Sequence, residues 1–78
     1  MDKKERILAR HEVMNRICSK PDLVAKIEEF NYIPNISAVI DDLVYFKFIR
    51  VKKDGTLEVK EHIARIWNKL GGEEYGDD

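Results

Sequence analysis

Residues 35–60, NISAVIDDLVYFKFIRVKKDGTLEVK, decide the fold of this 78-residue chain. Apolar residues recur at helical spacing in the first half of the stretch, and Asn35 is a residue type that often caps the start of a helix. We therefore predict a helix over residues 35–46. Its buried residues would be Ile36, Val39, Ile40, Leu43 and Val44, and its exposed residues Ser37, Ala38, Asp41, Asp42 and Tyr45.

The second half of the stretch predicts a β-hairpin around Lys53-Asp54-Gly55. A three-residue loop with Gly55 left-handed places the apolar residues of both strands on one face of the hairpin and the charged residues on the other. A two-residue Asp-Gly loop would instead oppose Val51 to Glu58 and mix the faces. The three-residue loop is therefore favoured, with Val51 opposite Leu57, Ile49 opposite Val59, Arg50 opposite Glu58, and Lys52 and Lys53 at the tip.

Two helices are predicted ahead of this stretch. The first covers residues 3–18, with Ile7, His11, Met14, Ile17 and Cys18 at spacings of three and four. The second covers residues 21–30, because Pro21 is tolerated in a first turn and the apolar residues Leu23, Val24, Ile27 and Phe30 follow it. Pro34 then forces a break before Asn35.

A last helix is predicted over residues 61–70. Ile63, Ile66, Trp67 and Leu70 have helical spacing, and Gly71-Gly72 marks the end of the helix. Residues 71–78 carry four acids, no base and little apolar content, so we expect a disordered tail. The chain is thus expected to form one domain over residues 1–70 followed by an acidic tail over 71–78.

The net charge of −1 conceals segregated charges. Residues 3–20 hold six basic and two acidic residues, and residues 47–60 hold five basic and two acidic residues. Between them, residues 22–46 hold five acids and one base. Two positive segments therefore flank a negative one, and the positive segments are candidates for contact with phosphate.

The order helix, helix, turn, helix, basic-tipped hairpin resembles the winged helix-turn-helix superfamily over roughly residues 5–70. The resemblance implies a mainly α fold with a β-hairpin (α+β) and a C-terminal helix. It also implies a small protein that binds double-stranded DNA, regulates transcription and acts by binding only. Its third helix would lie in the major groove and its wing would touch the DNA backbone. The helix that begins at Asn35 would be the recognition helix, and Arg50, Lys52 and Lys53 would be the wing contacts. By their chemistry, Asn35 and Ser37 are suited to contact bases or phosphates, and Tyr45 and Lys47 could reach phosphates.

The third helix departs from that pattern, because its exposed face carries Asp41 and Asp42 and no Lys or Arg before Lys47. Carboxylates near phosphate repel it. The alternative is a winged-helix interaction module that binds a protein of the transcription or replication machinery. Its contacts would come from Asp41, Asp42 and Tyr45.

Other functions have little support from the residues. His11, His62 and Cys18 do not have the spacing of a metal site, so no metal or cofactor is expected. Adjacent carboxylates such as Asp41 and Asp42 point about 100° apart on a helix and do not converge on one proton. We therefore expect no enzymatic activity. One cysteine fits a reducing, cytoplasmic setting, and no apolar run is long enough for a membrane. The apolar residues around Trp67 could either complete the core or form the interface of a homodimer, and the sequence does not decide between the two.

Overall fold

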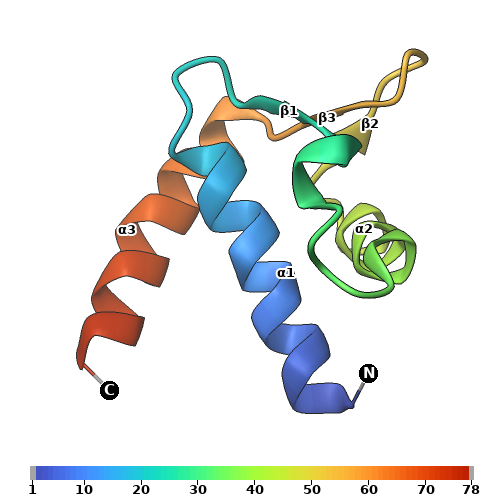
Figure 1. Ribbon diagram of the computed structural model, residues 1–78. Helices are drawn as coiled ribbons and strands as arrows, with labels where there is room; N and C mark the ends of the chain where they lie inside the picture. Colours follow the sequence, from blue (N-terminus) through green and yellow to red (C-terminus); the bar gives the residue numbers. More distant parts are fainter. Residues whose placement is uncertain (1, 78) are drawn as a thin grey trace.

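The computed structural model describes the backbone of residues 2–77 and the side chains of residues 2–69 (Figure 1). Its fold is α+β and mainly helical, as the sequence predicts. The elements follow the order α1 (Lys3–Cys18), β1 (Val24–Lys26), the 3₁₀ helix η1 (Ile27–Phe30), α2 (Ile36–Tyr45), β2 (Arg50–Val51), β3 (Thr56–Glu58) and α3 (Glu61–Asp77). The three strands form one antiparallel sheet in the order β1-β3-β2.

A single hydrophobic core joins α1, α2 and the sheet. Met14 and Ile17 of the predicted α1 stripe are fully buried, while Ile7 and His11 are only partly buried. A buried side chain of this size contributes roughly 1.5–3 kcal/mol relative to an exposed one. The largest fully buried side chains are Phe30, Met14, Ile17, Leu43, Leu57, Val13, Val39 and Val59.

Helix α2 confirms the predicted helix over 35–46 to within a residue at each end. Two details differ. Val44 is 41% exposed, because it lies on the solvent side of the helix beyond the Leu43 contact with the core. Asn35 stands at the N-cap position in the left-handed conformation, with φ +56°, and its side chain makes no capping hydrogen bond.

The hairpin has the predicted three-residue loop. Arg50 pairs with Glu58 and Val51 pairs with Leu57, and the Lys52 N–H donates to the Thr56 carbonyl at 2.8 Å. Gly55 is left-handed, with φ +88°. Val51 is 47% exposed although its partner Leu57 is buried. The reason is the strand order, since β2 is an edge strand and β3 is the central one.

The helix predicted over residues 21–30 is wrong. Residues 24–26 form β1, which pairs with β3 through Val24–Glu58, Ala25–Leu57 and Lys26–Thr56, and only residues 27–30 turn, as η1. Residues 24–26 form a strand because their pairing covers an edge of β3 that would otherwise be open. The single turn that follows is enough to bury Phe30. The Glu29 carboxylate accepts a hydrogen bond from the Lys26 N–H at 2.9 Å and so fixes the junction between strand and turn.

The last predicted helix exists, but its predicted end is wrong. The α3 backbone continues through Gly71-Gly72 to Asp77. Each glycine costs a helix interior only about 1 kcal/mol, which does not by itself stop a helix. Leu70 and the side chains of the acidic residues 71–78 lie outside the described residues, so the division into a domain and a tail stays a prediction.

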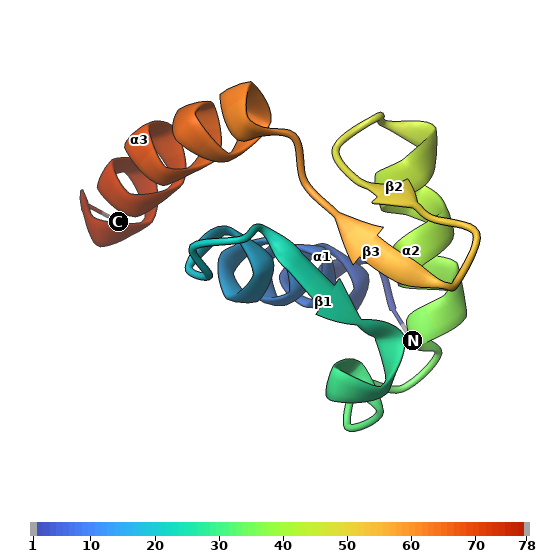
Figure 2. The ribbon, with the colours of Figure 1, turned by 90° about the horizontal axis from the view of Figure 1, so that it is seen from above.

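Among the residues whose side chains are described, the first turns of α3 pack against α1. The Trp67 indole N–H donates to Asn15 Oδ1 at 2.7 Å, and Ala64 is buried, whereas Ile66 is 53% exposed. Asn68 Nδ2 also donates to the Cys18 carbonyl at 3.4 Å, and toward its C-terminal end α3 leads away from α1 (Figures 1 and 2). Within residues 2–77, no helix combines the length and the apolar character needed to cross a membrane.

Candidate nucleic-acid interface

The exposed face of α2 carries polar residues and no cation. Ser37, Asp41 and Val44 follow one another at helical spacing on this face and are all exposed. Tyr45, at the end of the helix, is 80% exposed. The face therefore offers hydrogen-bonding groups near Asn35 and Ser37 and an aromatic ring at its other end.

The predicted cations gather where α2 meets the hairpin. A hollow of about 400 Å³ brings Lys47 and Arg50 together, although they follow different elements of the chain. Lys60 also lines this hollow and was missed in the sequence. Strand alternation could have identified it, because residues 58 and 60 lie on one face of β3 and its extension. The lining residues are Val44, Lys47, Ile49, Arg50, Val51, Glu58 and Lys60.

Lys47 occupies a backbone position that usually favours glycine. It follows the α2 C-cap Phe46 with φ +65°. Its N–H donates to the Val44 carbonyl at 3.0 Å, and the Phe48 N–H donates to the Leu43 carbonyl at 2.9 Å. These two bonds are the Schellman motif, in which the left-handed residue is most often Gly. A left-handed lysine costs roughly 1–2 kcal/mol, so the fold retains a cation here at some expense in stability.

The loop at the hairpin tip is held by a hydrogen bond to one of its own side chains, the carboxylate of Asp54. The Thr56 N–H donates to Asp54 Oδ1 at 2.9 Å, and this hydrogen bond lowers the pKa of the Asp54 carboxyl. Lys52 lies 3.7 Å from the Glu58 carboxylate across the hairpin. Lys53 is exposed in the loop. The predicted wing cations are thus at the surface, with Asp54 and Glu58 beside them.

The two aspartates of α2 do not share one surface. Asp41 is exposed, whereas Asp42 turns toward α1 and accepts hydrogen bonds from Arg6 Nε at 2.6 Å and Nη2 at 2.7 Å. These bonds from Arg6 lower the pKa of Asp42. The alternative protein-binding set is therefore divided, with Asp41 and Tyr45 in solvent and Asp42 paired within the fold.

The basic residues of α1 are mostly engaged inside the molecule. Arg10 lies 4.0 Å from Asp42, with its guanidinium 5.4 Å from the centre of the Phe46 ring. The Arg16 guanidinium stands 5.8 Å from the centre of the Tyr32 ring, and Lys20, two residues beyond the end of α1, pairs with Glu29. Helix α1 therefore offers DNA less positive charge than its composition suggests.

The chemically reactive side chains do not converge. Burial raises the pKa of the Cys18 thiol to about 11 and lowers the pKa of His11, whose ring packs edge-on against Trp67 at 5.3 Å. His62 is exposed at the start of α3. Across the described residues, no group of three or more His, Cys, Asp or Glu side chains is arranged to hold a metal ion.

Comparison with known proteins found no family model, no curated protein and no solved structure that matches the chain.

Proposed function

We propose that this chain is a winged-helix protein that binds double-stranded DNA and regulates transcription by binding alone. The order of its elements supports the assignment: α1, β1, a helical turn, α2, then the hairpin β2-β3, with β1 paired to β3. Helix α2 takes the role of the recognition helix, and the loop Lys53–Gly55 takes the role of the wing. The turn η1 stands in for the second helix.

The observation that carries DNA binding is the hollow between the end of α2 and the hairpin. Lys47, Arg50 and Lys60 line it, with Glu58 as the one acid. A DNA strand that passes between a recognition helix and a wing brings its phosphates to such a position. Asn35 and Ser37 would then meet the base edges, and Tyr45, Lys52 and Lys53 would meet the backbone. The pairing of Asp42 with Arg6 leaves Asp41 as the single unpaired carboxylate of α2 among the described residues.

Fluorescence anisotropy on random duplex DNA at two salt concentrations tests the proposal. Binding should weaken steeply with salt, and Lys52→Ala with Lys53→Ala should weaken it on every sequence. The slope of log affinity against log salt should fall by about 0.9 for each phosphate that the variant no longer neutralises. Lys4→Ala with Lys69→Ala is the matched control, since it removes the same charge from exposed lysines of α1 and α3 that lie outside the hairpin and its hollow.

Absence of binding by the unmodified chain at low salt would reject DNA binding. Equal affinity of the wing variant and the unmodified chain would remove the wing from the interface while leaving the hollow to be tested through Arg50→Ala and Lys60→Ala.

One observation favours a second function, the binding of a protein of the transcription or replication machinery. Val44 and Tyr45 expose 41% and 80% of their surface on α2, next to Asp41. Exposed apolar and aromatic groups mark protein interfaces more often than phosphate sites. In this alternative, Asp41 and Tyr45 contact the partner protein and the hairpin does not.

A further inference from the structure

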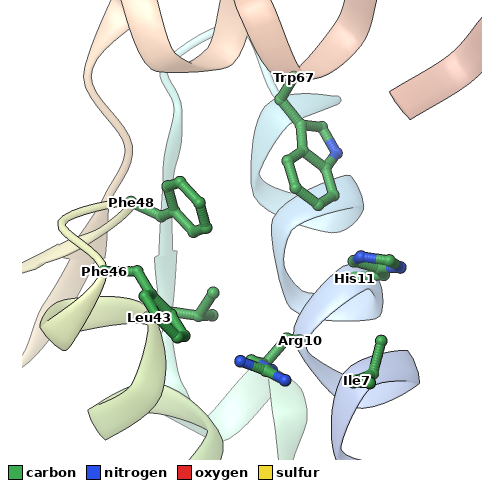
Figure 3. Close-up of a pocket in the computed structure, with 7 residues that line it drawn as sticks. All are labelled: Ile7, Arg10, His11, Leu43, Phe46, Phe48 and Trp67. Carbon is green, nitrogen blue, oxygen red and sulfur yellow. The ribbon is translucent and has the colours of Figure 1, made fainter. Parts of the chain in front are cut away.

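A second hollow, lined by residues other than those assigned to DNA, has aromatic walls. It measures about 320 Å³ and lies where α1, the α2–β2 link and α3 meet (Figure 3). Phe46 and Phe48 have ring centres 6.0 Å apart, and Phe48 and Trp67 have ring centres 6.4 Å apart. Phe46 is 48% exposed and Phe48 is 36% exposed. Clustered aromatic residues with an arginine are the composition of a binding hot spot rather than of a finished core.

The edge of this hollow along α1 is positively charged. Arg10 lines it, and Lys3 and Ile7 precede Arg10 on the same helix face by their spacing. Arg6 lies one turn before Arg10, and its two hydrogen bonds go to Asp42. Asp42 is the carboxylate beside Arg6 and Arg10, so these two cations share one negative charge. An occupant with apolar and acidic groups would therefore be complementary in charge.

The chain itself contains such a segment. Residues 71–78, GGEEYGDD, carry four acids, one tyrosine and no base. They cannot reach the hollow of their own molecule, because the α3 backbone runs on through Asp77. Tyr75 lies eight residues beyond Trp67, a rise of about 12 Å along the same helix, and α3 leads away from α1 (Figures 1 and 2).

We propose that the aromatic hollow receives the acidic segment 71–78 of a second copy of the chain. The contact is reciprocal, so two copies close into a symmetric dimer with two equivalent contacts. It uses none of the residues assigned to DNA, so it stands or falls independently of the proposed function.

Sedimentation velocity of the full chain over a wide concentration range tests for this dimer. Phe46→Ser removes a wall of the hollow, and Glu73→Gln with Glu74→Gln removes two charges from the segment. Each should weaken the dimer about tenfold or more, and added salt should weaken it further. Leu8→Ser and Glu28→Gln with Glu61→Gln are controls that remove exposed groups of the same kinds elsewhere. Circular dichroism checks that each variant is folded.

The fluorescence of Trp67 reports binding at the hollow itself, because Trp67 lines the hollow and is the only tryptophan of the chain. A synthetic peptide with the sequence of residues 70–78 has no tryptophan. Under the proposal it changes Trp67 fluorescence at saturable concentrations and competes with the dimer, and the peptide with both Glu residues replaced by Gln binds about tenfold more weakly. The proposal would be overturned if the chain stayed monomeric and the peptide did not bind to it. A dimer of equal strength in the Phe46→Ser variant would overturn it as well.

Discussion

Arg6 and Asp42, 36 residues apart in sequence, form a two-pronged ion pair that ties the first turns of α1 to the middle of α2. A fork of this kind fixes orientation as well as distance, because Nε and Nη2 of the guanidinium each donate to a different oxygen of the carboxylate. The pair therefore sets how the proposed recognition helix sits on the rest of the domain.

Asp42→Asn should lower the stability of the fold near neutral pH and lose its effect in acid. The hydrogen bonds from Arg6 hold the pKa of Asp42 below its usual 3.8. A carboxyl with a lowered pKa in the folded state stabilises the fold above its unfolded pKa, and this contribution disappears as pH falls through the lower value. Urea denaturation at about pH 7 and at progressively lower pH measures the difference between variant and unmodified chain.

Asp41→Asn is the matched control for this prediction, since Asp41 is the exposed neighbour. Its substitution should change stability by no more than about 0.5 kcal/mol. A deficit of Asp42→Asn that stayed constant into strong acid would show that the lost stability does not come from the ionised pair.

The parts of the fold that sequence predicts well are those with local causes. The hairpin register follows from one turn and from alternation within ten residues, so Arg50–Glu58 and Val51–Leu57 could be paired in advance. Strand β1 could not, because its partners in β3 lie 30 to 34 residues away and the pattern of residues 23–30 fits a helix equally well.

The residues of the candidate site also differ in how well the sequence alone predicts them. Lys47, Arg50, Lys52 and Lys53 are identifiable from charge next to a hairpin. The separation of Asp41 from Asp42 depends on Arg6, which no local pattern connects to α2. The left-handed Lys47 was equally hidden, because a glycine is the usual sequence signal for that position.

The Cys18 thiol should react slowly in the folded chain. It is buried, and burial raises its pKa from 9.0 to about 11. The thiolate population near pH 8 is then about a hundredfold smaller than that of an unshifted thiol, and access is restricted in addition. Reaction with a chromogenic disulfide reagent, with and without urea, measures the rate. Equal rates in the two conditions would contradict burial of the thiol.

Reversing the charge of Asp41 separates the two candidate functions. Under DNA binding, Asp41→Lys removes a repulsive carboxylate from α2 and adds a cation, so affinity should rise and its dependence on salt should steepen. Under protein binding through Asp41 and Tyr45, DNA affinity should not change and capture of the partner should be abolished. Asp42→Lys is not an equivalent test, because it also places a third cation beside Arg6 and Arg10.

Lys47→Gly should stabilise the fold and weaken DNA binding in the same molecule. Glycine adopts the left-handed conformation at φ +65° without the penalty of a side chain, so the free energy of unfolding should rise by about 1 kcal/mol. The same change removes a cation from the hollow beside the hairpin, so the salt slope of DNA affinity should fall by about 0.9.

Lys47→Ala resolves the two effects, because it removes the charge and keeps the strained backbone. It should match Lys47→Gly in DNA affinity and match the unmodified chain more closely in stability. Urea denaturation and anisotropy on the same three proteins provide both measurements. A gain in stability without any decrease of DNA affinity in Lys47→Gly would mean that the strained lysine is not retained for contact with phosphate.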